Sequence, residues 1–545
     1  MWDFTPLQGN QAGQTQKVLV PSCWESYPNL RSYRGEGLYT RRFIGGGNLR
    51  FEFKGVSHTG DVYLDGVQIA HHYNAYTPFS AVVPDVPQSE HILEVRVDNR
   101  FSPDSALHIP NDYMTYGGIN RPIILENVGG SFLEWVHYTP AQKNGHWHCG
   151  VQASVRGVKE DGPVDVQVEL AGCTISLGTV QPQPGQTATV NGNFDFAEEA
   201  IQPWSVEHPA LYTAAAQLVQ NGVLVDDLIE RIGFREIRVE GRKILLNGQP
   251  VRIKGVCRHE DWEGFCCALT PAHMQKDLAL LRDLGGNSVR TVHYPNDERF
   301  LDLCDEQGVL VWEENHARGL VEEDMRNPNF EPQCEAVNQE MVQAHYNHPC
   351  IYIWGVMNEC ASETEYGRDC YQKQLSQLRS MDQSRPLTFA TCRFTHDGHG
   401  ESFHLDDICM DLPDVASFNI YPLWYFDCSV PRFLEQIHAA LGQTPAAGKP
   451  FLISEVGAGA EYGCHANPEE KWSEEYQAAA LEQQLTAVLQ DLECCGVYIW
   501  QYADVRVSQE WFARRPRSYN NKGILDEYRR PKLAYGQVKK LFTEK

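Results

Sequence analysis

The sequence of 545 residues lacks several features that mark broad classes of protein. No window approaches 18 uninterrupted apolar residues, so we expect no helix that crosses a membrane. Basic residues are scarce, since 46 Lys and Arg stand against 72 Asp and Glu, and the net charge of −26 disfavours nucleic acid or an anionic membrane as the main partner. No basic region followed by an apolar run opens the chain, so we expect no signal peptide and predict a cytoplasmic protein.

The 17 cysteines are scattered, and no C-x-x-C motif occurs among them. The adjacent pairs Cys266-Cys267 and Cys494-Cys495 do not have the spacing of zinc ligands. Cys257 and His259 form an alternative metal pair, but no second pair at a suitable spacing accompanies them. We therefore expect free thiols in a reducing compartment and no bound metal.

The first 235 residues show the alternation of apolar and polar residues that is typical of β-strands. It is clear at residues 49–53 and again at 164–168, and Asn221-Gly222 is a typical two-residue hairpin turn. We predict two β-sandwich domains, at 1–130 and 131–235. One larger sandwich is the alternative.

From about residue 250 the pattern changes to alternating strands and helices. Thr270 and Pro271 begin a helix and Gly285 follows its end. The predicted strands begin at residues 251, 287, 309, 351, 387, 415, 451 and 497. Eight such strands over about 300 residues favour a (β/α)₈ TIM barrel at 236–545. The alternative is a doubly wound open sheet, but no G-x-G-x-x-G motif follows the first strand.

Two glutamates follow the fourth and seventh predicted barrel strands. Glu359 comes after Ile351–Val356, and Glu455 comes directly after Phe451–Ser454. Barrel enzymes carry their catalytic groups at the carboxyl ends of the strands, so both side chains face one mouth. Two carboxyls placed there could flank a glycosidic bond, one as acid and one as nucleophile. The alternative is that either glutamate is a solvated loop acid or an ion-pair partner.

Several segments together resemble the signatures of glycoside hydrolase family 2, and in detail those of gut-bacterial β-glucuronidases. These segments are residues 111–121, 233–235, 252–261, 287–295, 354–359, 419–425, 453–455 and 520–524. The resemblance implies a jelly-roll sandwich, an immunoglobulin-like sandwich and a catalytic barrel. It also implies an exo-acting, retaining β-glycosidase with Glu359 as acid/base and Glu455 as nucleophile, without a cofactor.

The resemblance also assigns residues to the sugar. Asn520 and Lys522 would bind the uronic-acid carboxylate, and Asp112 would reach the 4-hydroxyl from the first sandwich. Tyr421, Tyr425 and Trp500 would contact the sugar. From the chemistry of the site we add Arg290 as a cation beside the nucleophile, Asn358 as a partner of the 2-hydroxyl and His259 as a partner of another hydroxyl.

Two departures from the family pattern affect specificity. The arginine that usually stands four residues before the Asn of N-x-K is here Pro516, flanked by Arg514, Arg515 and Arg517. Either a neighbouring arginine substitutes or the preference at C4 has changed. The chain also lacks the long loop that covers the aglycone in some relatives, so we expect an open entrance unless another subunit covers it.

We therefore predict hydrolysis of small-molecule or glycan β-D-hexuronides, with glucuronides first and galacturonides as the alternative. A β-galactosidase is more remote, because a neutral sugar would leave Lys522 without a partner. A non-catalytic carbohydrate-binding protein would need neither Glu359 nor Glu455. A homo-oligomer is expected.

Overall fold

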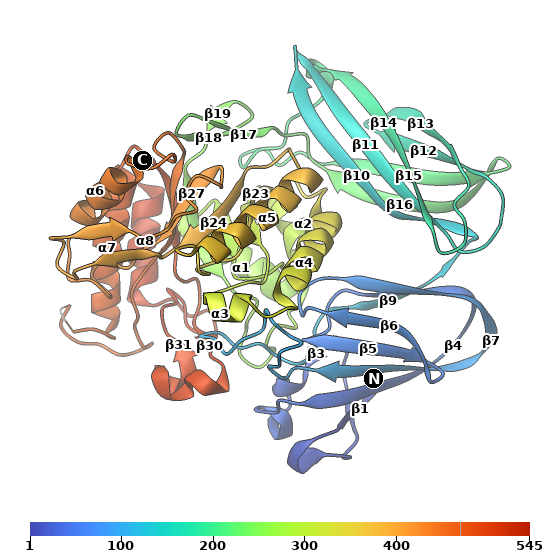
Figure 1. The fold of residues 1–545 in the computed structure, drawn as a ribbon, viewed down its shortest axis with the longest axis horizontal. Coiled ribbons are helices and arrows are strands. Elements are labelled where there is room, and N and C mark those ends of the chain that lie inside the picture. Colours follow the sequence, from blue (N-terminus) through green and yellow to red (C-terminus); the bar gives the residue numbers. More distant parts are fainter. Residues whose placement is uncertain (469, 545) are drawn as a thin grey trace.

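The computed structural model describes residues 1–468 and 470–544, which form two β-sandwiches packed against a barrel (Figure 1). Long antiparallel pairing of β4 (Glu36–Phe53) with β7 (Phe79–Asp98) dominates the first sandwich. The other strands of its main sheet are β1 (Trp2–Pro6), β2 (Gln16–Val18), β5 (Thr59–Leu64), β6 (Val67–Tyr73) and β9 (Ile123–Val128). Two short strands, β3 (Ser22–Cys23) and β8 (Gly118–Ile119), pair separately.

The second sandwich has one sheet of three strands and one of four. The first holds β10 (Ser131–Lys143), β11 (His146–Gly157) and β14 (Thr187–Ala197), and the second holds β12 (Val164–Leu170), β13 (Cys173–Val180), β15 (Tyr212–Gln220) and β16 (Val223–Ile232). Asn221 and Gly222 join β15 to β16 with φ of 50° and 78°, the two positive values that a type I′ turn requires. The predicted hairpin is confirmed.

Eight parallel strands close into a barrel, which lies beside the two sandwiches in Figure 1. They are β20 (Ile253–Arg258), β21 (Ser288–Thr291), β22 (Leu310–Glu314), β23 (Ile351–Gly355), β24 (Leu387–Thr391), β27 (Val415–Asn419), β28 (Phe451–Val456) and β29 (Cys494–Ile499). Each begins within three residues of its predicted start. The closed order excludes the open doubly wound sheet, and the predicted (β/α)₈ barrel is confirmed. A small sheet of β17 (Ile237–Glu240), β18 (Lys243–Leu246) and β19 (Gln249–Pro250) precedes it.

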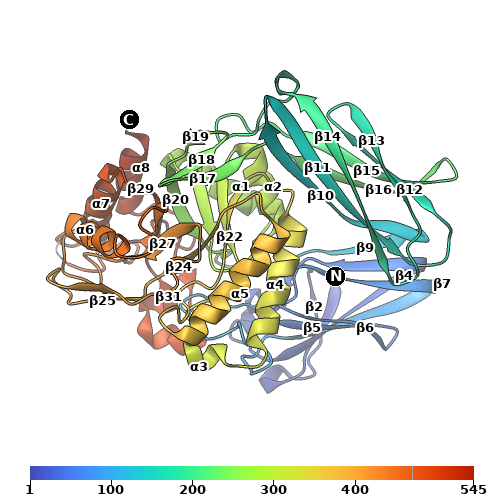
Figure 2. The same cartoon turned by 45° about the horizontal axis from the view of Figure 1, so that its top comes forward.

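Helices surround the barrel strands (Figure 2). They are α1 (Pro271–Leu284), α2 (Glu298–Gln307), α3 (Glu322–Met325), α4 (Phe330–His345), α5 (Glu365–Met381), α6 (Val430–Leu441), α7 (Glu474–Gln490) and α8 (Leu533–Thr543). The predicted start and end of α1 are confirmed. Thr270 and His273 form a capping box before the helix, and Gly285 ends it with φ 83°. Among the described residues, no helix is both long enough and apolar enough to span a membrane.

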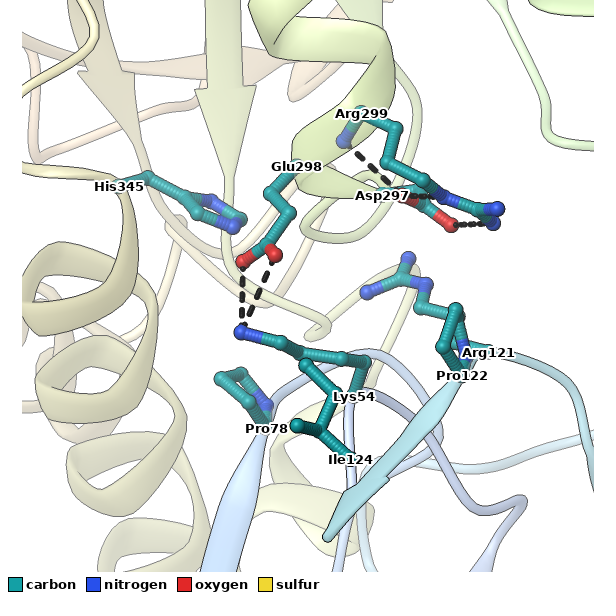
Figure 3. A pocket seen from close by; sticks show the side chains of 9 residues that line it. All are labelled: Lys54, Pro78, Arg121, Pro122, Ile124, Asp297, Glu298, Arg299 and His345. Carbon is teal, nitrogen blue, oxygen red and sulfur yellow. Dashed lines mark hydrogen bonds and ion pairs between the residues drawn. The ribbon is translucent and has the colours of Figure 1, made fainter. Parts of the chain in front are cut away.

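The first sandwich is held against the barrel by buried polar contacts. Arg121 pairs with Glu260 at 2.8 Å, and both side chains are almost fully buried. Nearby, a cavity of about 140 Å³ lies between the two domains, and Figure 3 shows Lys54, which follows β4, reaching Glu298 of α2 across it at 3.1 Å. These contacts fix the position of residues 99–121, which run from the sandwich to the barrel mouth.

Candidate active site

Both candidate catalytic carboxyls lie at the mouth of the barrel. Glu359 follows β23 in a loop, whereas Glu455 is the fifth residue of β28, so the seventh strand extends two residues beyond the predicted run Phe451–Ser454. The Glu455 side chain is buried. Its carboxyl is therefore held on a strand and largely shielded from solvent.

Arg290 of β21 binds the nucleophile candidate from below the mouth. Its Nη1 donates to Oε1 of Glu455 at 3.0 Å, and its Nη2 donates to Oδ1 of Asn358 at 2.7 Å. Two further hydrogen bonds of 3.0 Å join Nη2 to the carboxylate of Glu314. The guanidinium is fully buried and lies over the ring of Trp312 at 4.6 Å. The structure thus brings the predicted cation, Asn358 and Glu455 together.

Asn419, the last residue of β27, connects this cluster to Glu359. Its Nδ2 donates to Oε1 of Glu359 at 2.8 Å and lies 3.2 Å from Oδ1 of Asn358. The hydroxyl of Ser454 donates to Oδ1 of Asn419 at 2.7 Å, which fixes the orientation of the amide. A continuous hydrogen-bond network therefore links the two carboxyls.

Burial and the neighbouring charges determine the pKa of Glu455. Burial, and then the charge of Glu359, raise the pKa of Glu455 to about 8, although Arg290 and a 2.6 Å hydrogen bond from the hydroxyl of Tyr421 favour its ionised form. With a pKa of about 8, Glu455 is protonated at neutral pH in the free site.

Asp112 reaches the barrel mouth from the first sandwich and is surrounded by cations. Arg515 donates to its Oδ2 at 3.2 Å, and Arg318 lies 3.3 Å from its Oδ1. Asn520 donates from Nδ2 to the same Oδ2 at 3.1 Å. Burial would raise the pKa of Asp112, but the charges of Arg318, Lys522 and Arg515 outweigh it and lower the pKa. Asp112 is therefore a carboxylate.

Lys522 lies in an aromatic corner of the same mouth. Its Nζ donates to the hydroxyl of Tyr425 at 2.7 Å and lies 5.3 Å and 5.9 Å from the ring centres of Tyr421 and Trp424. Its side chain is almost wholly buried. Within residues 1–468 and 470–544, no carboxylate lies within ion-pairing distance of it.

The remaining predicted residues form one wall of the site. Trp500, directly after β29, stacks on His293 with ring centres 5.1 Å apart. His259, just after β20, stacks on Tyr113 at 4.7 Å, and burial lowers its pKa to about 3, so it is neutral. Its Nδ1 lies 3.3 Å from the hydroxyl of Tyr294, and its Nε2 has no partner among the described residues.

Comparison with known proteins identifies the family. Residues 237–544 match the model described as "Glycosyl hydrolases family 2, TIM barrel domain", and residues 131–235 match "Glycosyl hydrolases family 2". The chain belongs to glycoside hydrolase family 2. The resemblance found in the sequence is confirmed.

The chain is similar to several β-hexuronidases of known name. A crystal structure of a β-galacturonidase from Eisenbergiella tayi, bound to galacturonate, is 50% identical, with a TM-score of 0.94 and coverage of 99% of this chain and 95% of that chain. β-Glucuronidase of Sus scrofa is 27% identical over 98% of this chain and 85% of its own length. β-Glucuronidase of Paenibacillus borealis is 26% identical over 100% of this chain and 93% of its own.

Two residues of this family 2 site were given no role by the sequence argument. Asn419 lies in the signature segment 419–425, where only the tyrosines were assigned, and Arg318 carries no motif of its own. Arg515 was one of three arginines that could have replaced the usual one near C4. In the structure Arg517 pairs with Glu527 at 3.0 Å. Arg514 and Arg515 both lie over the ring of Trp511, at 5.1 Å and 5.2 Å, and of these two Arg515 pairs with Asp112.

Unpartnered polar atoms also gather at the mouth. Within the described part of the chain, the buried atoms without a hydrogen-bond partner include His259 Nε2, Asn358 Nδ2 and Asn520 Oδ1. Leaving such an atom unpaired costs about 1–3 kcal/mol. Their concentration around the two carboxyls suits a ligand with several hydroxyl groups.

Proposed function

We propose that this chain is an exo-acting, retaining β-hexuronidase. The observation that carries this proposal is Lys522, a buried cation with no carboxylate partner among the described residues, in the mouth that also holds Glu359 and Glu455. A buried unpaired cation is costly, so an anionic group of the substrate is the natural partner. A uronic-acid carboxylate is such a group.

The balance of charge supports a sugar with one negative charge. The residues described above contribute four carboxylates and four cations: Asp112, Glu314, Glu359 and Glu455, with Arg290, Arg318, Arg515 and Lys522. Burial lowers the pKa of His259 and of His316 to about 3, so these imidazoles add no charge. With one proton on the carboxyl pair, the set carries one positive charge, which one carboxylate would neutralise.

The two carboxyls then perform a double displacement. Glu455 attacks the anomeric carbon while Glu359 gives its proton to the departing oxygen. Water next attacks the anomeric carbon of the glycosyl-enzyme, Glu359 takes a proton from that water, and Glu455 is released as a carboxylate. In the reacting complex the proton that Glu455 holds in the free site has to be on Glu359, and Arg290 has to stabilise the ionised Glu455. Asn358 is the proposed partner of the 2-hydroxyl, and no cofactor takes part.

The proposed sugar is galacturonic acid. The usual arginine near C4 is replaced by Pro516, and Arg515 instead approaches from the side and pairs with Asp112. The galacturonate-bound relative of 50% identity favours the same sugar. Glucuronides, placed first by the sequence, are the second candidate, because the relatives of 26–27% identity are β-glucuronidases.

A comparison of p-nitrophenyl β-D-galacturonide, β-D-glucuronide and β-D-galactoside tests both parts of the proposal. We expect kcat/KM to be highest for the galacturonide and lowest for the galactoside, with retention of the β-configuration in the first-formed product. Preference for the galactoside would contradict a site for the substrate carboxylate. Preference for the glucuronide would support the prediction from the sequence, which placed glucuronides before galacturonides. We also propose a cytoplasmic location and a homo-oligomeric state, and the resemblance supports a gut-bacterial source.

A further inference from the structure

Arg318 touches both ends of the proposed sugar site. Its Nη2 lies 3.3 Å from Oδ1 of Asp112 and 3.9 Å from Oε2 of Glu359. Its Nη1 also contacts Oδ1 of Asn111. One guanidinium thus lies between the carboxylate that comes from the sandwich and the candidate acid/base of the barrel.

The backbone fixes this position. Arg318 lies in the loop after β22 and forms an isolated parallel bridge with Asn358, and the amide of Gly319 donates to the carbonyl of Asn358 at 2.8 Å. The loop of Arg318 is therefore bound to the residue that precedes Glu359. A change at the side chain of Arg318 should leave this backbone pairing in place.

Several charged or titratable groups face Glu359 from the surrounding elements. They are Arg318 and Glu314 from β22 and its loop, Cys360 beside Glu359, Cys392 and Arg393 after β24, Tyr421 after β27, and Glu455 of β28. Two of these are cations. Arg393 pairs with Glu363 at 3.1 Å and donates to the backbone carbonyls of Glu359 and Cys360. Of the two, Arg318 is therefore the cation that faces the carboxyl of Glu359.

We propose that Arg318 is a positioning residue that favours the ionised form of Glu359 and couples it to Asp112. This inference rests on the proposed function. An opposite charge within about 4–6 Å lowers a carboxyl pKa by about 1–3 units. Ionised Glu359 is the form that activates water, so Arg318 promotes hydrolysis of the glycosyl-enzyme.

The pH dependence of kcat/KM tests this role. Phenyl β-D-galacturonide has a poor leaving group and needs the proton of the acid, so the basic limb of its profile reports loss of that proton. In Arg318→Met the basic limb should move up by about one pH unit or more. Arg318→Lys keeps the charge and should return the limb toward the wild-type position.

Arg515→Met is the matched control, because Arg515 pairs with the same Asp112 at 3.2 Å but has no contact with Glu359 among those described. It should lower kcat/KM and leave the basic limb in place. Equal shifts in both variants would show that the effect passes through Asp112 alone and would overturn the proposal. An unmoved limb in Arg318→Met, with wild-type thermal unfolding, would overturn it as well.

A second readout separates the two chemical steps. The leaving group of p-nitrophenyl β-D-galacturonide needs little acid assistance. Hydrolysis of the glycosyl-enzyme, the second step, should then limit the steady-state rate. Arg318→Met should show a larger p-nitrophenol burst relative to its steady-state rate than wild type, and a smaller burst would contradict the proposal. If the wild type hydrolyses no hexuronide, the proposed function fails and this inference falls with it. An active wild type with an unchanged Arg318→Met refutes the inference alone.

Discussion

The Nζ of Lys522 donates a hydrogen bond of 2.7 Å to the hydroxyl of Tyr425. Among the described residues, this neutral hydroxyl is the side-chain group that accepts a hydrogen bond from Lys522. A substrate carboxylate would add a charge-assisted bond. Lys522→Met keeps the apolar length of the side chain and removes the charge. Such a bond is worth about 1.5–3 kcal/mol, so kcat/KM for the hexuronide should fall about 100-fold.

The matched measurement for Lys522→Met uses the β-D-galactoside, which has no carboxylate. Its kcat/KM should stay the same or rise, because the variant no longer buries an unpaired charge against a neutral sugar. Equal losses of kcat/KM on both sugars would show that Lys522 maintains the structure around Tyr425 and does not bind the substrate carboxylate.

Glu359→Gln should be sensitive to the leaving group. Removing a general acid costs about 10²–10⁴-fold, and the full loss is expected for phenyl β-D-galacturonide. The loss in the first step should be smaller for p-nitrophenyl β-D-galacturonide, whose leaving group departs without a proton. Glu455→Gln should abolish turnover of both substrates, because it removes the nucleophile. Similar behaviour of the two variants across leaving groups would argue against the assignment of Glu359 as acid.

Glu455 also makes stability depend on pH. Its folded pKa of about 8 lies above the ordinary value of 4.5, so the folded state binds a proton that the unfolded state releases between these values. Stability should therefore fall as the pH rises from about 4.5 to 8, by a few kcal/mol. Glu455→Gln resembles the neutral form. Its melting temperature should match wild type at pH 5 and exceed it at pH 8.5, and a constant difference between these pH values would reject the raised pKa.

Much of the fold could be predicted from the sequence because its signals are local. Alternation at residues 164–168 marks a strand with one buried face, and the turn at Asn221-Gly222 depends on two residues alone. The eight barrel strands are short apolar runs bounded by helices. Their predicted starts therefore lie within three residues of the observed ones. The position of Glu455 within β28 was missed, since the predicted strand stopped before this charged residue, two residues before the end of β28 at Val456.

The site could be predicted only where a motif carries the chemistry. Glu359 and Glu455 each follow a short run of mostly apolar residues, and barrel geometry brings the ends of these runs to one mouth. Arg318 acts through a contact with a residue more than two hundred positions away, and no local pattern encodes that contact. Arg515 differs from Arg517 only in the path of its loop, where Arg517 takes a positive φ of 55°.

The cysteines differ sharply in exposure, and this predicts their reactivity. All 17 are unpaired, and the exposed ones are Cys173 and Cys464, with Cys392 half-buried. Burial raises the pKa of the Cys392 thiol, so it should also react slowly. A thiol reagent such as DTNB should label two cysteines rapidly in the native protein. Denaturation should release the rest, and rapid labelling of many thiols in native buffer would contradict the buried positions.

Arg515 should set the preference at C4, since it binds the carboxylate that the sugar's 4-hydroxyl is proposed to reach. Its Nη2 lies 3.2 Å from Oδ2 of Asp112, and Asn520 donates to the same oxygen. Arg515→Ala leaves Asp112 with more freedom to accept a hydroxyl from either face, so the ratio of kcat/KM for galacturonide over glucuronide should fall about tenfold. Arg514→Ala, which removes an arginine that lies over Trp511, is the control and should keep the ratio. A ratio that changes equally in both variants would show that the whole loop, and not the Arg515–Asp112 pair, determines the choice of epimer.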